Sequence, residues 1–317
     1  SEEQFLTEFP TVLSATRLRQ DATQAPQAVT VIDQQMIRAS GAREFAELFR
    51  MVPGFTVSYV AHLKGLQPIV NYHGLGREYF SRLQVLIDGR SMNNATLGGV
   101  DWSEFPLALE DLDRIEVIRG PSSASHGIGA FAATINFISK YPAQQRGASA
   151  RVNAGNDGVR DATLQFGAGA GPLDYRPTAA YRADDGFDEI PDARDRRYAS
   201  ARGDLQFGPV DHLMLQAGAT DGDSDAGSGI ATNPLRSVGV RTWYGQANWE
   251  RSFSADSGFY LQFYYYRYEL IPNARALYIR YSRCADDPQQ PFAEFARELF
   301  AAADADPANW LAHGRSY

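Results

Sequence analysis

The chain has 317 residues, a formal net charge of −8 and one cysteine, Cys284. The acidic balance argues against non-specific nucleic-acid binding, which needs cations to neutralise phosphates. A single cysteine excludes an internal disulfide and a multi-cysteine metal site, and the lack of any apolar run of about 18 residues excludes a transmembrane helix.

The first predicted elements are a strand and a helix. Val29–Ile32 reads as a short strand. The segment after it places apolar residues at spacings of three and four, the pattern of an amphipathic helix. These residues are Phe45, Leu48, Phe49 and Val52. Pro53-Gly54 stops the helix, because proline cannot continue it and glycine favours the turn that follows.

Three further strands complete a small mixed α/β unit before residue 141. Leu83–Ile87 reads as a strand that ends in an Asp88-Gly89 turn. The acid-rich segment LEDLDR reads as a short helix that leads into a strand beginning at Ile115. AFAATINFISK is an alternating strand.

The loop that begins Gly120-Pro121-Ser122-Ser123 follows a strand, as many phosphate-binding loops do. No lysine occurs between Gly120 and Gly127, and the next element is a strand rather than a helix. A phosphate would therefore lack both a cation and a helix dipole. We interpret the loop as a structural turn in which proline fixes φ and the serines cap backbone groups.

From Arg146 to about Leu270, seven strands of about ten residues alternate with a period of two. The turns GPLD, GPVD and SADSG are short, whereas the connections at 185–197, 221–239 and beyond 270 are long. Only Asn156-Asp157-Gly158 is short where a long connection is expected. Short turns at one rim and long loops at the other are typical of an outer-membrane barrel. A soluble β-sandwich alternates similarly and is the alternative.

Aromatic residues on the last two strands favour the barrel. One face of the strand at 240–253 carries Trp243, Gly245, Ala247, Trp249 and Phe253. Trp243 and Phe253 would lie about 33 Å apart along the strand, or about 25 Å along the membrane normal after tilting. The next strand points Phe259, Leu261, Phe263 and Tyr265 outward, opposite the polar-tipped face Tyr260, Gln262, Tyr264 and Tyr266.

Three motifs now carry a family resemblance. IEVIRGPSSASHGIGAFAATINFISK resembles the closing motif of the plug domain of TonB-dependent outer-membrane receptors. LQVLIDGRSMNN is similar to the plug's other hallmark strand and turn, and FAELFRMVPGFTV to its first helix and Pro-Gly. The order matches over residues 26–140, and the cobalamin, colicin I and siderophore receptors look nearest. His73 replaces the family's arginine, and Ala132-Ala133 its Gly-Gly.

The resemblance implies an α+β plug domain inside an antiparallel transmembrane β-barrel of about 22 strands, of which about seven are present here. Residues 1–25 would hold the TonB box and a periplasmic segment, and residues 26–141 the plug. Residues 146–317 would form the first part of the barrel, with a long extracellular loop from about 271. We therefore expect the working protein to be longer than this sequence, and a disulfide partner of Cys284 to lie outside it.

The resemblance further implies active, TonB-dependent import of a scarce ligand across the Gram-negative outer membrane, with the amino terminus in the periplasm. An iron–siderophore complex is the expected ligand. A haem or cobalamin receptor of the same family, a passive channel and a soluble β-rich binding protein are the alternatives. The protein would be no enzyme and would hold no cofactor, because an iron chelate or haem would be its cargo. Expected partners are TonB of the TonB-ExbB-ExbD system, outer-membrane lipid and lipopolysaccharide, and a small-molecule metal chelate, but no nucleic acid.

The TonB box is expected within PTVLSATR, residues 10–17, by resemblance to the family pattern. The residues that would bind TonB are Thr11, Val12, Leu13, Ser14 and Ala15. The stretch is β-prone, follows a proline and is flanked by polar residues, as a strand-addition peptide should be. The family's leading Asp-Thr is Phe9-Pro10 here. A disordered tail with a chance apolar patch is the alternative.

The ligand site is expected where the plug apex meets the lumen wall, by analogy with the family. The segments after Pro53-Gly54 and Asp88-Gly89 would supply Tyr59, His62, Asn93, Asn94 and Trp102, and the wall Tyr264 and Tyr266. Haem would require an axial histidine, for which His62 is available; no metal ligands of the protein's own are expected. Each of these residues is alternatively a solvated loop side chain.

Charged contacts between plug and barrel are expected from Glu116 and Arg119. The lumen side would offer Arg151, Asp161, Arg176, Arg182, Arg202 and Asp204. A plug that must come loose is better held by polar, hydrated contacts than by an apolar interface. Ordinary surface ion pairing is the alternative for both plug residues.

Overall fold

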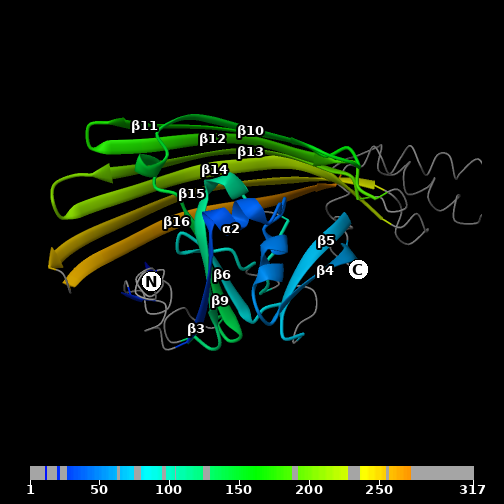
Figure 1. Ribbon diagram of the computed structural model, residues 1–317, viewed down its shortest axis with the longest axis horizontal. Helices are drawn as coiled ribbons and strands as arrows, with labels where there is room; N and C mark the ends of the chain where they lie inside the picture. The colour runs from blue at the N-terminus through cyan, green and yellow to red at the C-terminus, as the bar shows by residue number, and fades with distance from the viewer. Residues whose placement is uncertain are drawn as a thin grey trace, which may run out of the picture.

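The computed structural model describes residues 11–12, 20–21, 27–62, 65–74, 80–94, 98–103, 105–123, 129–187, 192–227, 236–254 and 257–272. A seven-stranded antiparallel sheet arches over a smaller five-stranded sheet, which we call the plug sheet (Figure 1). In the described part of the chain, no helix has the length and apolar character needed to cross a bilayer.

The plug sheet has the strand order β3-β8-β9-β6-β7. Its strands are β3 (Ala28–Asp33), β8 (Leu112–Arg119), β9 (Ala133–Ser139), β6 (Leu83–Ile87) and β7 (Arg90–Ser91). Only β6 and β9 run parallel. The central strands β8 and β9 are largely buried, while β3 lies at the edge and pairs, within the described residues, with β8 alone. The strands predicted in this region are confirmed.

The predicted amphipathic helix is of a different type from the one expected. Ala46–Met51 (η2) is a 3₁₀ helix of six residues, and an α-helix (α2) covers Gln34–Ala39 ahead of it. Asp33 caps α2 by accepting a hydrogen bond of 2.8 Å from the backbone N–H of Met36. The apolar spacing was correct, because Leu48 and Phe49 are fully buried. A short 3₁₀ helix can also bury apolar residues at this spacing.

A hairpin that the sequence analysis did not predict projects beside η2. Its strands are β4 (Phe55–His62) and β5 (Gly65–Tyr72). Gly54 has φ of +83° and lies against the Tyr72 ring, where a Cβ atom would come within 2.8 Å of Cε2. The Pro53-Gly54 pair therefore marks a turn that only glycine fits well.

Aromatic side chains fill the core between the plug sheet and η2. The rings of Phe45 and Phe105 stack at 4.7 Å between centroids, and Trp102 meets Phe49 edge-on at 5.0 Å. Phe137 of β9 packs against Phe105 at 5.2 Å. Such pairs add about 0.5–1.5 kcal/mol each beyond the burial of their area.

The Gly120 loop is a turn, as predicted, over the part of it that the structure describes. Gly120 has φ of +106°, which strongly favours glycine. Its N–H donates to the carbonyl of Ala132 at 2.9 Å, and the hydroxyls of Ser122 and Thr134 lie 2.7 Å apart. These bonds close the connection between β8 and β9. The loop therefore supports the sheet.

The seven predicted strands of the second half are confirmed and lie in chain order. They are β10 (Gly147–Ala154), β11 (Arg160–Ala170), β12 (Leu173–Asp184), β13 (Arg194–Gln206), β14 (Asp211–Ala226), β15 (Arg236–Ser254) and β16 (Ser257–Pro272). Turns at 171–172 and 207–210 lie at one rim, and β12 and β14 end at the other rim.

The two faces of this sheet are reversed relative to a soluble sandwich. The face toward the plug is polar: Arg176, Thr178 and Gln216 are at most 5% exposed. The opposite face is apolar and open, with Leu215 48% and Phe263 65% exposed. A sandwich would bury the apolar face in its core. A membrane barrel points it at lipid, which is the arrangement seen here.

Candidate functional site

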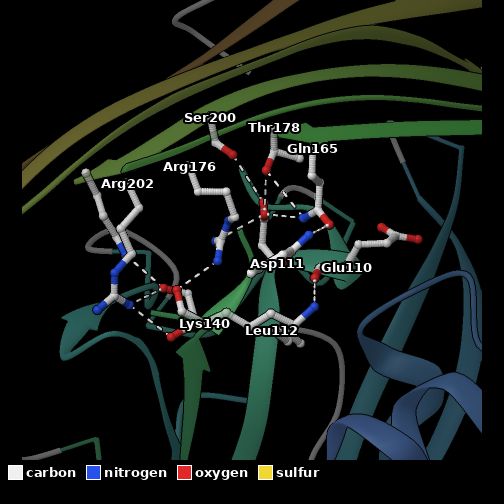
Figure 2. A network of polar contacts seen from close by, with 12 residues as sticks. Glu110, Asp111, Leu112, Lys140, Gln165, Arg176, Thr178, Ser200 and Arg202 are labelled. Atoms are coloured by element: carbon white, nitrogen blue, oxygen red, sulfur yellow. Dashed lines mark hydrogen bonds and ion pairs between the residues drawn. The ribbon is translucent and has the colours of Figure 1, made fainter. Parts of the chain in front are cut away.

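Polar side chains attach the plug to the inner face of the seven-stranded sheet, and we call this set of contacts the seam. Its centre is Asp111, which is fully buried (Figure 2). One carboxylate oxygen accepts from Thr178 Oγ1 at 2.6 Å and Gln165 Nε2 at 2.8 Å, and lies 3.2 Å from Arg176 Nη2. The other oxygen accepts from Ser200 Oγ at 3.1 Å. Three neighbouring strands thus converge on one plug carboxylate.

Strand register brings these partners together. Gln165 of β11 lies opposite Thr178 of β12, which lies opposite Ser200 of β13. Residues directly opposite one another on antiparallel strands point to the same face. Asp111 reaches them because it ends the short 3₁₀ helix Leu109–Asp111 (η3), just before β8 enters the plug sheet. Figure 2 shows the carboxylate pointing up into this polar row.

The end of β9 forms the second part of the seam. Arg202 Nη1 donates to the carbonyl of Ser139 at 2.9 Å and to its Oγ at 2.7 Å. Arg176 Nη1 donates to the carbonyl of Lys140 at 2.8 Å. The Lys140 ammonium turns back into the plug and donates to the carbonyl of Glu110 at 2.5 Å. Burial, and then the positive charges of Arg176 and Arg38, lower the pKa of Lys140 to about 8.

The seam should therefore become more stable as pH rises. Lys140 has its ordinary pKa of 10.5 in the unfolded chain and about 8 in the folded one. Between these values the unfolded state binds the extra proton, so the free energy of unfolding increases with pH. Melting temperatures of the detergent-solubilised protein across this window should rise more for the wild type than for Lys140→Met. Parallel curves for the two proteins would contradict the assignment.

The Asp88-Gly89 turn is the third part of the seam. Asp88 has φ of 47° and Gly89 of 81°, the signs of a type I′ hairpin turn between β6 and β7. The Asp88 carbonyl accepts from Gln246 Nε2 at 2.8 Å and Gln262 Nε2 at 3.1 Å. Its carboxylate accepts from Gln216 Nε2 at 2.7 Å and also ties down the end of β9. Side chains of β14, β15 and β16 therefore donate hydrogen bonds to the same turn of the plug.

A buried guanidinium stands next to this turn. Arg90 is fully buried, and its Cζ lies 3.7 Å from the ring centroid of Tyr244. Its nitrogens have no hydrogen-bond partner among the described residues. Burial lowers the pKa of Arg90, against the opposing effects of Tyr244 and Asp88. The stacked ring compensates part of the lost hydration.

A cluster of ion pairs forms the fourth part of the seam. The Arg43 guanidinium binds Asp161 with two bonds of 2.8 and 2.9 Å and Asp184 with one of 3.0 Å. Glu44 forms an ion pair with Arg194, which also reaches Asp184 at 3.1 Å. Hydrogen bonding to Asp161 raises the pKa of Arg43, so that guanidinium stays charged at every working pH.

A small cleft of about 50 Å³ lies beside this cluster and includes Arg43, Glu44, Asp184 and Arg194 in its lining. Positively charged, negatively charged and aromatic side chains line the cleft. The plug contributes Arg43, Glu44, Phe45, Leu66, Gln67, Trp102, Ser103 and Phe105, and the sheet side Arg182, Asp184, Asp192, Arg194, Arg196, Tyr198 and Ser224. A polar ligand with an apolar part would find partners for both here.

The structure places the residues expected at the plug apex on several different elements. Tyr59 is partly exposed on β4, and burial together with Glu44 and Glu47 raises its pKa to about 12. His62 ends β4, and its side chain lies outside the described residues. Trp102 is a core residue, only 6% exposed, whose edge reaches the cleft.

The two asparagines lie in the loop after β7. Asn93 has a structural role: it donates to the carbonyl of Leu83 at 2.7 Å and accepts from the N–H of Val85 at 3.0 Å. Asn94 is exposed, and its backbone pairs with Gly98 and Gly99. The asparagine side chain at position 93 mimics a backbone strand, which is why a polar residue is needed there.

On the sheet side, Tyr264 is 48% exposed, and Tyr266 packs against the plug core. Thr11 and Val12 of the expected TonB box form the strand β1 (Thr11–Val12), paired with β2 (Gln20–Asp21). Leu13, Ser14 and Ala15 lie outside the described residues.

The two plug residues expected to contact the barrel, Glu116 and Arg119, lie on β8. Glu116 is fully buried in β8 and pairs with Arg114, two residues away on the same strand, at 2.9 Å. Arg119 closes the ladder with β3 opposite Ala28. The seam draws mainly on plug residues in turns and just before or after the strands. Of the lumen residues expected to meet the plug, Arg151, Asp161, Arg176, Arg182 and Arg202 do so.

Comparison with known proteins agrees with this architecture. The family model described as the TonB-dependent Receptor Plug Domain matches residues 21–134. The vitamin B12 transporter BtuB of Vibrio vulnificus is 29% identical over 153 residues, covering 48% of this chain and 24% of that protein. The ferripyoverdine receptor of Pseudomonas aeruginosa is 28% identical over 232 residues, covering 69% of this chain and 26% of the receptor.

Solved structures show the same fold. The crystal structure of the ferripyoverdine receptor of Pseudomonas aeruginosa, bound to ferripyoverdine, superposes with a TM-score of 0.65 at 22% identity. The match covers 83% of this chain and 37% of that one. This chain spans about a quarter of the length of the curated relatives it matches.

Proposed function

We propose that this chain, which belongs to the TonB-dependent outer-membrane receptors, is part of a transporter rather than an enzyme. It imports a scarce small ligand across the outer membrane, using energy delivered through TonB. The seam is the observation that supports this proposal. A plug held by buried carboxylates, amides and guanidinium groups can exchange these contacts for water when it shifts, whereas an apolar interface would resist separation.

The amino-terminal segment is the proposed point of energy coupling. Residues 11–15 would pair with TonB by strand addition, in which main-chain hydrogen bonds supply the affinity. A pull on this segment reaches the plug first at β3, which is an edge strand. The chain order therefore links the coupling segment to the part of the plug that has the fewest sheet neighbours.

The proposed ligand is an iron–siderophore complex. The lining of the cleft suits contact with one part of a polar, chelate-like ligand, because arginines and carboxylates stand there beside Phe45, Trp102 and Tyr198. Cobalamin is a second candidate, because relatives named for vitamin B12 transport match about half of the chain; haem is a third. The open apolar face of the sheet would contact outer-membrane lipid and lipopolysaccharide.

A transport assay tests the proposal and separates its alternatives. Cells that lack the gene and cells that express it would be offered a panel of iron-55 siderophores, haem and labelled cyanocobalamin. We expect uptake of one class of compound that is lost in cells without TonB. Equal uptake with and without TonB would indicate a passive channel and overturn the proposal.

Leu13→Pro should abolish that uptake and leave ligand binding unchanged. Proline removes the backbone N–H that strand addition requires. Leu13→Val is the matched control, because it keeps the N–H and the β-propensity. Uptake and binding to purified receptor would be measured in parallel for both variants. Normal uptake by Leu13→Pro would place the TonB box elsewhere.

A further inference from the structure

Two cavities lie between the plug and the inner face of the sheet. The first is the cleft described above. The second, which we call the wall cavity, has about 900 Å³ and runs beside β10 and β11. On its plug side are α2 and residues 144–145, and on its sheet side the polar residues Ser149, Arg151, Asn153, Asp161, Thr163 and Gln165. Among the described residues, the linings of the two cavities share only Arg43 and Arg182.

Arg43 occupies the boundary between the cavities. Its guanidinium joins Asp161, which lines the wall cavity, to Asp184, which lines the cleft. Arg182 holds the backbone of the same residue by donating to the Arg43 carbonyl, and pairs with Glu110 at 3.0 Å. The partition is therefore made of charged side chains rather than packed backbone.

The segment that carries Arg43 lies between two helices, whereas other seam residues of the plug lie at the ends of sheet strands. It connects α2 to η2 through Gly41, which has φ of +68°. Helix α2 in turn follows directly from the edge strand β3. The other seam residues Asp88, Asp111 and Ser139 belong to the ends of β6, β8 and β9. A movement of β3 and α2 could withdraw Arg43 while these three anchors stay in place.

We propose that Arg43 is the gate of a transport path that runs from the cleft into the wall cavity along β10 to β13. The inference rests on the proposed function. The Arg43 side chain is 26% exposed, and its partners Asp161 and Asp184 are 5% and 12% exposed. When the guanidinium withdraws, both carboxylates face a wet cavity and regain water. Breaking the pairs therefore costs less than it would in a dry interior.

Ion conductance tests the gate without any import ligand or TonB. The full-length receptor would be reconstituted in planar lipid bilayers in KCl. We expect Arg43→Ala to conduct at least ~10-fold more than the wild type, because ions cross only a continuous wet path. Arg241→Ala is the matched control: it removes an exposed arginine–aspartate pair with Asp221 that lies outside the seam and lines neither cavity, and should stay at the wild-type level.

Arg43→Cys supplies a reversible version of the experiment that does not depend on the alanine variant folding. The unmodified cysteine should conduct, a positively charged methanethiosulfonate reagent should close the path, and a reducing agent should reopen it. The wild type treated with the same reagent controls for Cys284. An equal rise of conductance in Arg241→Ala would show that the effect is not specific to Arg43. Silence in both Arg43 variants, or no response to the reagent, would place the path elsewhere. Each of these results overturns the gate. Failure of TonB-dependent uptake would leave this test unaffected.

Discussion

Asp111→Ala is expected to destabilise the plug–sheet assembly by about 3–5 kcal/mol, the usual cost of leaving one partner of a buried ion pair uncompensated. The substitution removes the acceptor for Gln165, Thr178 and Ser200 and leaves the Arg176 guanidinium, 3% exposed, without its carboxylate. Thermal unfolding of the purified receptor in detergent, followed by near-ultraviolet circular dichroism, would measure the loss.

Two companion variants show whether the charge or the shape matters. Asp111→Asn keeps one acceptor oxygen and should lose less stability than the alanine variant. Arg176→Leu combined with Asp111→Ala should be less harmful than the sum of the two single changes, because neither charge is then left buried alone. Strict additivity would show that the two residues act independently and that the seam is not centred on their pair.

Phe263→Arg should impair membrane assembly far more than Tyr264→Arg. Phe263 lies on the open face of the sheet and is 65% exposed, opposite Ala247. An arginine there meets the hydrocarbon, at a cost of about 2–4 kcal/mol near the bilayer midplane. Tyr264 lies opposite Gln246 on the polar inner face and tolerates a charge.

The measurement is the yield of folded receptor in isolated outer membranes, read from its heat-modifiable migration on gels. Phe263→Leu controls for the loss of the ring and should assemble normally. Equal yields for the two arginine variants would mean that the outward face of the sheet has been assigned incorrectly.

Period-two patterning predicted the seven strands well, because each strand buries one face and exposes the other. The turn residues in GPLD and GPVD marked the strand ends within a few residues. The hairpin of β4 and β5 escaped this reasoning. Its strands border the core on one side only, and Pro68 interrupts the pattern. The helix at 46–51 was found by its apolar spacing, but spacing alone does not distinguish a short 3₁₀ helix from an α-helix.

The sequence predicts polar contacts between the plug and the sheet, but it does not predict which plug residues make them. The polar inner face could be read from Asp161, Arg176 and Arg202, since alternation assigns each residue to a face. Asp88, Asp111 and Arg43 could not, because turns and short helices carry no periodicity that says where they point. An acidic residue directly before a buried strand, as in LEDLDR, is the available signal, but the acid-rich segment by itself indicates only a short helix.

The turn at Asp88 has a consequence for which mutations the receptor would tolerate. Gln246 and Gln262 bind the carbonyl oxygen of residue 88, an atom that every amino acid possesses. Asparagine accepts a positive φ as readily as aspartate, so it would keep the path of the main chain and both of these bonds. The main-chain part of this junction therefore depends on the amides of the wall, and its side-chain part on an acceptor oxygen at residue 88. A survey of variants should find asparagine accepted at 88, because it keeps the turn and one acceptor oxygen, and substitutions at 246 and 262 rejected even when they preserve the strand.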